Sequence, residues 1–435
     1  MTRVLYTLLL RLALPFAVAR LYWRSLKTPA YRQRISERLT WGRPAPPVGI
    51  WIHAVSVGEA QAAAPLIRYL LNRAPSRPIL VTTTTPTGAE RLHDLFGETV
   101  AHRYTPFDLP TILTRFLAQT QPRLVIIMET EIWPNMLNMC ARQSIPVVLA
   151  NARLSARSAH GYARFASLTR QTLAQFTLIA AQTDADARRF IDLGADPARV
   201  RVTGSIKFDL IQPVDLVVQT KEMRRDWGQR PVWIAASTHE GEETILLEAH
   251  RRLRARLLPN ALLVLVPRHP ERFERVAALV AQNDLSLVRR SRRAACQAET
   301  AVFLGDTMGE LPVFLAAGDA AFIGGSLVPT GGHNPLEAAA VGVPVIVGSH
   351  TFNFAAITDL LIAECAACRI ADAATLADLL QDWLTNVTLR TQMGERGRQV
   401  VERNRGALAR LIGLLDDIQT SLLPAGRTVS PADDG

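Results

Sequence analysis

Lysine is scarce in this chain of 435 residues. Lysine and arginine together number 49, and only Lys27, Lys207 and Lys221 are lysines, which leaves 46 arginines. A lysine in a chain that otherwise uses arginine suggests a role that needs a compact point charge. Lys207, within the segment Thr203–Asp209, is the candidate, and a solvated surface lysine is the simpler alternative.

Cysteine is scarce as well, with four residues, of which Cys365 and Cys368 form a Cys-x-x-Cys pair. Such a pair can indicate a zinc or redox site. A structural zinc ion needs about four ligands, and no second pair with suitable spacing is present. We therefore interpret the cysteines as free thiols of a protein in a reducing cytosol. We expect residues 360–370 to form a helix end packed on a core.

The chain has no broad basic body, although its formal charge is +10. Residues 1–43 carry nine basic side chains and one acid, Glu37, which makes +8 and leaves +2 for the other 392 residues. A nucleic-acid-binding domain would spread basic residues over one face or along a helix. We therefore expect no nucleic-acid partner.

A clean membrane-spanning run is also missing. The apolar stretch Val4–Ala19 is interrupted by Arg11 and Pro15, so it falls short of the ~20 apolar residues that cross a bilayer. It lacks the small-residue cleavage site of a secretory signal. Basic and aromatic residues flank it, which is typical of an interfacial helix or signal-anchor on anionic lipids. We predict a membrane-associating arm over residues 1–43, and the alternative is a helix packed on the body of the protein.

Beyond this arm, apolar runs alternate with helical segments, as in a parallel, doubly wound α/β sheet. The pattern breaks between Lys207 and Trp227 and then restarts. We predict an N-terminal αβα domain over residues 44–210, a linker over 211–230, a C-terminal αβα domain over 231–423 and a disordered tail over 424–435. Ligands of such sheets bind beyond the carboxyl ends of the strands.

The most informative segment reads as a strand, a glycine-rich loop, a helix and a second strand. These are Ala321–Ile323, Gly324–Gly332, Asn334–Val341 and Val343–Val347. Glycines let a backbone approach a phosphate, and a helix start directs N–H groups at it. Glu337, early in the helix, is placed to accept two sugar hydroxyls. The segment predicts a nucleotide or sugar-nucleotide site, although such turns also occur without ligands.

Polar side chains follow several other predicted strands. Glu59 begins a helix after the first strand and can act as a base if it faces a cleft, or can simply complement the helix dipole. Glu129 and Glu131 follow an apolar strand and can orient a substrate or a basic partner. Arg268 follows another strand and can bind a phosphate through two bonds.

Two further residues remain open on their spacing alone. His269 can donate a hydrogen bond beside Arg268 or be structural. Asp306, in the loop-to-helix turn Gly305–Glu310, can help to read a base edge or cap the helix.

Nine segments give the sequence a specific family resemblance. They are SVGE, TTTTPTGAERL, METEIWPN, NARLSARS, TGSIKFD, STHEGEE, VPRHPERF, GDTMGEL and GGHNPLEAA. In this order, between about Tyr31 and Phe354, they resemble those of bacterial 3-deoxy-D-manno-octulosonic acid (Kdo) transferases of lipopolysaccharide synthesis. The hydrophobic and then basic N-terminus around AYRQRISERL is similar too.

The resemblance implies a GT-B fold of two Rossmann-like domains and an inverting transfer of Kdo from CMP-Kdo to the lipid A precursor. It implies no metal and no cofactor, and a place on the cytoplasmic face of the bacterial inner membrane. It assigns Glu59 as the base and Glu129 and Lys207 as supports of the transition state. The residues that it assigns to CMP are Pro267, Arg268, Met308, Gly309, Glu310, Asn334, Pro335, Leu336 and Glu337.

Two alternatives belong to other classes. The first is another GT-B enzyme such as a UDP-sugar epimerase, which would stay fully active on a water-soluble substrate without residues 1–30. The second is a membrane-tethered sugar-nucleotide-binding protein, whose function would survive Glu59→Ala.

Overall fold

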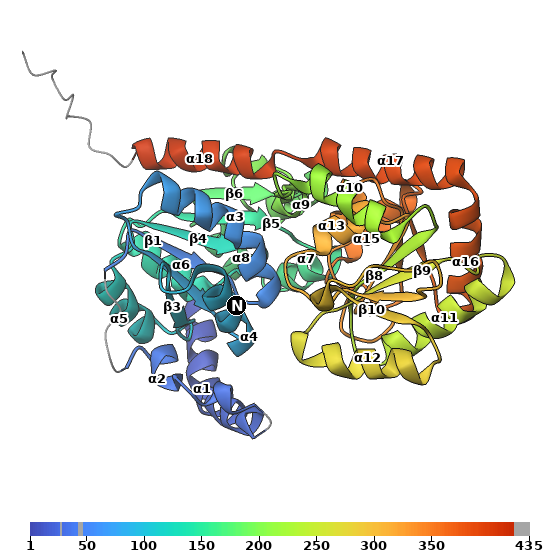
Figure 1. Cartoon of the computed structure of the whole chain (residues 1–435). Coiled ribbons are helices and arrows are strands. Elements are labelled where there is room, and N and C mark those ends of the chain that lie inside the picture. Colours follow the sequence, from blue (N-terminus) through green and yellow to red (C-terminus); the bar gives the residue numbers. More distant parts are fainter. Residues whose placement is uncertain (27, 42–46, 422–435) are drawn as a thin grey trace, which may run out of the picture. The chain divides into compact units, whose positions relative to one another are not determined.

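The structure, a computed structural model, describes residues 1–26, 28–41 and 47–421. Two compact units divide the chain (Figure 1). The first comprises Met1–Asp209 together with the residues from Arg405 onward, and the second comprises Leu210–Asn404. Each unit contains a 7-stranded parallel sheet covered by helices on both faces, which confirms the predicted doubly wound class.

In the first unit, the strand that comes first in the chain lies inside the sheet and not at its edge. The strands in spatial order are β3 (Ala101–Tyr104), β2 (Ile79–Thr83), β1 (Ile50–His53), β4 (Leu124–Met128), β5 (Val147–Ala152), β6 (Leu178–Ala181) and β7 (Val200–Val202). Side chains alternate between the two faces, so Trp51 enters one core while Ile50 and Ile52 enter the other. Both faces are buried, which explains the nearly continuous apolar runs of the central strands.

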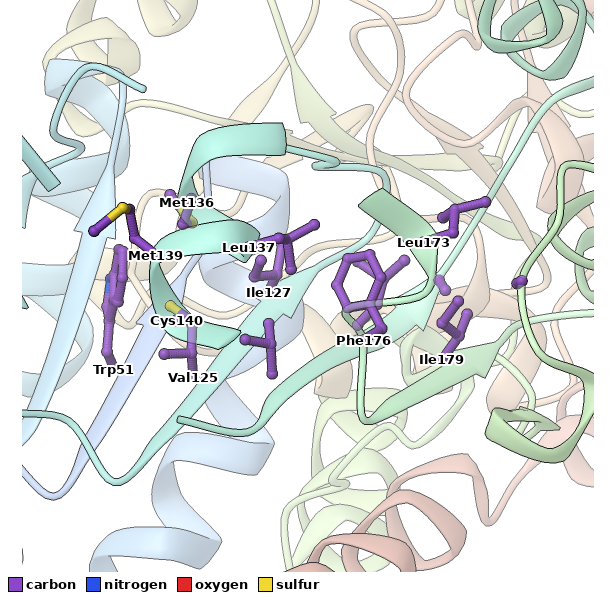
Figure 2. Packing of buried hydrophobic residues seen from close by; sticks show 14 of the residues in the cluster. Trp51, Val125, Ile127, Met136, Leu137, Met139, Cys140, Leu173, Phe176 and Ile179 are labelled. Carbon is purple, nitrogen blue, oxygen red and sulfur yellow. The ribbon is translucent and has the colours of Figure 1, made fainter. Parts of the chain in front are cut away.

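Helices of the first unit fall into two layers. One face of the sheet packs against α5 (Pro110–Thr120), α6 (Pro134–Arg142), α8 (Ala166–Leu173) and α9 (Asp184–Asp192). Figure 2 shows this core, with Leu137 of α6 and Phe176 after α8 over the strands. The other face packs against α3 (Val57–Arg73), α4 (Pro86–Phe96) and α18 (Ala407–Ser421). The surface helix α7 (Ala156–Ala163) buries none of its residues.

A second sheet of the same kind forms the second unit. Its strands in spatial order are β10 (Leu287–Arg289), β11 (Val302–Leu304), β9 (Leu262–Pro267), β8 (Val232–Thr238), β12 (Ala320–Ile323), β13 (Val345–Val347) and β14 (Ala367–Arg369). One face packs against α11 (Glu242–Arg256), α12 (Phe273–Gln282) and α16 (Ala373–Thr385). The remaining helices are α10 (Leu216–Trp227), α13 (Leu311–Ala317), α14 (Leu336–Ala340), α15 (Ala355–Ala363) and α17 (Val387–Asn404).

The last described helix, α18, differs from the predicted domain division. Residues 405–423 were assigned to the C-terminal domain, whereas α18 packs on the first unit. Ala407, Leu411 and Leu415, at helical spacing, enter the same core as α3. The Asp209 carboxylate holds the start of the helix by accepting the Gly406 and Leu408 N–H groups, each at 2.6 Å. This return of the chain follows from tertiary burial, which the local pattern did not reveal.

Two other expectations change. The predicted linker 211–230 contains α10, whose Trp227 ring contacts Phe303 at a centroid distance of 5.4 Å, so most of it belongs to the second core. The helix expected over Asn334–Val341 is shorter, because Pro335 precedes its first residue and only Leu336–Ala340 is helical. The tail predicted over residues 424–435 lies outside the described residues.

At the N-terminus, the apolar stretch forms the single helix α1 (Arg3–Ser25) despite its internal proline. Its 23 residues, at ~1.5 Å each, span ~35 Å. Among the described residues, α1 is the one helix long and apolar enough to cross a membrane, judged by length and composition. Leu12, Phe16 and Trp23 are exposed. The Tyr6 hydroxyl donates to Asp108 of the first unit at 2.9 Å, so the start of α1 is anchored to the protein.

The packing of α18 gives a stability prediction. Leu411 is fully buried, so Leu411→Ala should leave a cavity and lower the free energy of unfolding by about 3 kcal/mol. Asp417, exposed on the same helix, provides the control, and Asp417→Ala should change it by less than ~0.5 kcal/mol. Urea unfolding followed by tryptophan fluorescence measures both. Equal stability of the two variants would contradict the assignment of α18 to the first core.

Candidate functional site

In each sheet, the strands that come first in the chain are added towards one side and the later ones towards the other. The point where this order reverses is the switch point. In the first unit, β1 lies between β2 and β4, and in the second, β8 lies between β9 and β12. Loops at the carboxyl ends of these neighbouring strands separate and leave a crevice, which is where ligands of open α/β sheets bind. Glu59 follows β1, Glu129 follows β4, Arg268 follows β9 and the glycine-rich loop follows β12.

Glu59 lies in the first turn of α3, which begins after the N-cap Ser56. Its carboxylate turns back and accepts the Val55 N–H at 2.8 Å and the Ser56 hydroxyl at 3.2 Å. The Glu59 N–H in turn donates to the Ser56 hydroxyl at 3.3 Å, which completes a reciprocal capping arrangement. The side chain is half-buried and is therefore accessible as well as held in place.

The protonation of Glu59 is unusual for a helix start. The helix dipole favours the carboxylate form at such a position. Burial instead raises the pKa of Glu59 to about 8, and the negative charges of Glu129 and Glu131 add to the rise. The Val55 N–H opposes this effect without overcoming it. A carboxyl group that titrates near neutral pH is matched to proton transfer.

Glu129 and Lys207 form an ion pair at 2.8 Å beside this carboxyl group. Both side chains are largely buried. Glu129 has a φ of 59°, in the left-handed region, so its backbone is held in an uncommon conformation at the strand end. Lys207 belongs to the short 3-10 helix η3 (Ile206–Phe208). The structure therefore brings the three predicted residues Glu59, Glu129 and Lys207 together, with Glu131 near them.

Asn151, which the sequence analysis did not single out, fixes the turn that carries Lys207. Its buried side-chain carbonyl accepts the Ile206 N–H at 3.1 Å, and its own φ is 53°. The signal was available in the segment NARLSARS, where an asparagine stands at the end of an apolar run, and Asn151 lies next to the last residue of β5. Asparagine tolerates the left-handed region better than most residues, so it suits this position.

The glycine-rich loop after β12 differs from the expectation for a phosphate cradle. The fully buried Glu242 carboxylate accepts the N–H groups of Gly325, Ser326 and Leu327 at 2.7, 3.0 and 2.9 Å. It also accepts the His239 N–H at 2.8 Å. The N–H groups expected to hold a phosphate are thus satisfied from within the protein.

The segment from Asn334 to Glu337 closes this loop. The Asn334 side-chain oxygen accepts the Leu336 N–H at 3.1 Å and so caps the start of α14. Pro335 and Leu336 are buried. Burial raises the pKa of Glu337, while Asn334 and the positive charge of Arg268 oppose the rise. The Arg268 guanidinium is therefore near enough for its positive charge to act on the Glu337 carboxyl group.

Arg268 directly follows the buried Pro267 at the end of β9. Its N–H donates to the Thr238 carbonyl at 3.0 Å, which ties the loops after β8 and β9 together. Within the described part of the chain, its half-buried guanidinium has no ion pair or hydrogen bond. It is therefore free to bind an anion such as a phosphate.

The loop after β11 carries the other residues assigned to CMP. Met308 is 63% exposed, and Gly309 has a φ of 86°. Arg290 holds Glu310 through bonds of 2.6 and 3.0 Å. Asp306 does not cap α13, because its carboxylate instead accepts the Arg289 guanidinium at 2.7 Å. Since β11 neighbours β9, this loop and Arg268 lie on the same edge of the sheet.

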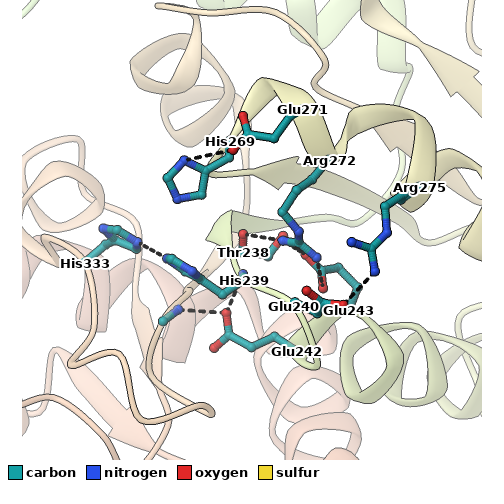
Figure 3. Close-up of polar contacts among 11 residues, drawn as sticks. Thr238, His239, Glu240, Glu242, Glu243, His269, Glu271, Arg272, Arg275 and His333 are labelled. Atoms are coloured by element: carbon teal, nitrogen blue, oxygen red, sulfur yellow. Dashed lines mark hydrogen bonds and ion pairs between the residues drawn. The ribbon is translucent and has the colours of Figure 1, made fainter. Parts of the chain in front are cut away.

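Three histidines gather at the same edge (Figure 3). The Nε2 atoms of His239 and His333 are 2.8 Å apart, and the two rings stack. His269 meets His239 edge-on at a centroid distance of 5.6 Å. Burial lowers the pKa of His333 to about 3, so this pair is neutral near pH 7. His269 itself is exposed, and the contacts of its ring are to His239 and Glu271.

The Cys-x-x-Cys pair in the sequence raises the question of a metal or redox site. In the described ranges, no group of three or more His, Cys, Asp or Glu side chains is placed to hold a metal ion. Cys365 and Cys368 are free thiols. The helix end expected there is present, since α15 ends at Ala363, but Cys368 then lies in strand β14.

The hydrogen bonds from the N–H groups of the glycine-rich loop to Glu242 give a second prediction. Glu242→Gln places an N–H₂ donor against backbone N–H groups, so it should lower the free energy of unfolding by about 3 kcal/mol. Glu240, which is exposed two residues before Glu242 and is paired with Arg275, is the control. Chemical unfolding measures the two variants. If Glu242→Gln is as stable as Glu240→Gln, the carboxylate does not hold the loop.

Comparison with known proteins identifies the family of this chain. Residues 33–210 match the family model described as 3-Deoxy-D-manno-octulosonic-acid transferase (kdotransferase), and residues 237–400 match Glycosyl transferases group 1. The chain is 45% identical over 420 residues to the 3-deoxy-D-manno-octulosonic acid transferase of Haemophilus influenzae, which covers 95% of this chain and 98% of that protein. It is 37% identical to that of Bordetella pertussis, over 96% of this chain and 99% of that protein.

A solved structure supports the fold alone. The UDP-GlcNAc 2-epimerase from Neisseria meningitidis superposes with a TM-score of 0.55 at 15% identity, over 85% of this chain and 100% of that one. At this identity the likeness does not support the epimerase alternative. The identity to the transferases extends over nearly their whole length, so the chain belongs to the 3-deoxy-D-manno-octulosonic acid (Kdo) transferase family of glycosyltransferases and has its GT-B fold.

Proposed function

We propose that this Kdo transferase moves Kdo from CMP-Kdo to the lipid A precursor, lipid IVA, by a single inverting displacement without a metal. The observation that carries the proposal is the state of Glu59. Its carboxyl group titrates near pH 8, is half-buried and accepts one backbone N–H at the switch point of the first unit. These are the properties of a general base in a site closed to most water.

The displacement needs Glu59 in its carboxylate form. The acceptor hydroxyl oxygen bonds to the anomeric carbon of Kdo while the bond from that carbon to the CMP phosphate oxygen breaks. The hydroxyl proton passes to Glu59, and the bonding electron pair leaves with CMP. Lys207, held in place by its ion pair with Glu129 at 2.8 Å, directs its ammonium group at the charge that develops in the transition state.

The residues for the donor lie in the second unit. Arg268 has a guanidinium available for the CMP phosphate, and the capped start of α14 at Asn334 directs its dipole to the same place. Glu337, next to Arg268, is placed to accept sugar hydroxyls. The other residues proposed to hold CMP are Pro267, Met308, Gly309, Glu310, Pro335 and Leu336.

The features of α1 support the proposed acceptor and location. A lipid precursor remains in the membrane, so the enzyme has to work at its surface. The exposed apolar side chains of α1 and the basic residues of the N-terminal arm suit anionic lipids of the bacterial inner membrane, on its cytoplasmic face. There the reaction would contribute to the core of lipopolysaccharide.

Glu59→Gln tests the proposal most simply. The amide accepts no proton, so turnover should fall about 10²- to 10⁴-fold. Wild-type activity should rise with pH through about 8, because the folded-state pKa of Glu59 lies there and only the carboxylate acts as a base. Mass spectrometry of lipid IVA incubated with CMP-Kdo measures the added Kdo. Glu90→Gln, at an exposed site on α4, is the control.

Either of two results would count against Glu59 as the base. One is wild-type turnover by Glu59→Gln, and the other is a flat wild-type profile between about pH 6 and 9. Kdo transfer absent from the wild type, with CMP still bound, would remove the acceptor assignment.

The donor site is tested through Arg268. Arg268→Gln removes the charge-assisted bonds to the phosphate, so the KM for CMP-Kdo should rise about 10- to 100-fold, with a smaller change for the lipid acceptor. Arg275→Gln changes an exposed arginine on α12 that is paired with Glu240, and it should leave both KM values unchanged. Steady-state kinetics with each substrate varied distinguishes these outcomes. An unchanged KM for CMP-Kdo in Arg268→Gln would exclude Arg268 from the donor site.

A further inference from the structure

One basic residue of the N-terminal arm is buried. Arg38, the last residue of α2 (Ile35–Arg38), is 4% exposed, although the arm was predicted to associate with a membrane. Within the described ranges, its guanidinium forms no ion pair. Its neighbour Glu37 is engaged by Arg34 at 2.6 Å and by the Tyr104 N–H at 3.0 Å. A guanidinium removed from water without a carboxylate is costly, so its remaining contacts need an explanation.

Those contacts are specific. The Arg38 Nη2 donates to the Thr84 carbonyl at 2.8 Å, and the guanidinium lies 4.4 Å from the centroid of the Tyr104 ring. No partner of its buried Nε is found in the part of the chain that the structure describes. The side chain is therefore directed at one backbone carbonyl, in the loop between β2 and α4, at the edge of the sheet that carries Glu59.

Thr84 continues the connection to the proposed base. Its N–H and its hydroxyl both donate to the Val55 carbonyl, at 3.1 and 3.0 Å. The Val55 N–H then donates to the Glu59 carboxylate at 2.8 Å. Two consecutive loops are thus joined by one path of hydrogen bonds from Arg38 to Glu59. The path therefore acts through geometry, because each bond fixes the position of the loop backbone that carries the next one.

We propose that Arg38 is a positioning residue for Glu59, holding the Thr84 carbonyl so that the Val55 N–H stays directed at the carboxylate. The inference rests on the proposed role of Glu59 as the base. It gives the last basic residue of α2 a role in the site rather than at the lipid surface. Arg38 has no contact with substrate in this account and acts through the two loops.

The expected pH effect has a definite sign. The charged groups around Glu59 are Glu129 and Glu131, and Lys207 is paired with Glu129. The Val55 N–H lowers the pKa of Glu59, so a loosened bond should raise that pKa. A higher pKa means less carboxylate at a given pH. The activity of Arg38→Met should therefore rise at a higher pH than that of the wild type.

Four variants test this inference by the pH dependence of kcat/KM for the lipid acceptor. Arg38→Met should reduce kcat/KM about 10- to 100-fold and move the midpoint to higher pH. Arg38→Lys keeps the charge but loses the planar fork, so it should be intermediate. Thr84→Val keeps the Thr84 N–H and loses the hydroxyl, so it should shift the midpoint in the same direction by less. Arg34→Met, in the residue before α2, is the control and should keep the wild-type midpoint.

The melting temperature of each variant identifies a merely structural role. If Arg38→Met lowers the melting temperature but keeps the wild-type pH midpoint, the inference is wrong. The same holds if Arg34→Met shifts the midpoint as much as Arg38→Met. Failure of the proposed function is distinct, because it would remove transfer by the wild type itself in the same assay.

Discussion

A carboxylate that turns back from a helix start to accept backbone N–H groups lies at the switch point of both units. In the second unit, Glu242 accepts four N–H groups and is fully buried. In the first unit, Glu59 accepts one N–H and one hydroxyl and is half-buried. Burial raises the pKa of both carboxyl groups. Four N–H groups oppose the rise at Glu242, which holds a loop, whereas at Glu59 one N–H opposes it and the charges of Glu129 and Glu131 add to it.

Three of the non-glycine residues with a positive φ lie at the carboxyl ends of central strands. Glu129, Asn151 and Ser237 have φ values of 59°, 53° and 56° although none is glycine. Such conformations persist where surrounding contacts over-determine them, and they are found most often at functional sites. Here the contacts are the Lys207 ion pair, the Ile206 N–H and the irregular pairing between β8 and β9. The strain directs side chains towards the crevice that a regular strand would not reach.

The sequence predicted the central strands and the acids that follow them well. Parallel strands buried on both faces read as apolar runs, so the alternation of apolar runs with helical segments predicted the doubly wound class that the two sheets confirm. Glu59 and Glu129 were candidates because they follow predicted strands, and Lys207 because lysine is scarce; the structure brings the three together, and their roles remain a proposal.

Long-range contacts could not be predicted in this way. Glu242 reaches a loop more than eighty residues away, and α18 returns to the first unit to bury Leu411. Arg38 looked like one of nine basic residues of a membrane arm, and only tertiary packing distinguishes it from the others. In each case the local sequence is ordinary, and the partner that gives the residue its role is distant in the chain.

The anomeric configuration of the product tests the central claim most directly. A single base, Glu59, acting in one displacement requires inversion at the anomeric carbon of Kdo. Nuclear magnetic resonance of the Kdo-containing lipid, made with purified enzyme and CMP-Kdo, reports that configuration. Inversion relative to CMP-Kdo is the result that the account predicts. Retention would require a covalent intermediate or a different mechanism, and would contradict the role given to Glu59.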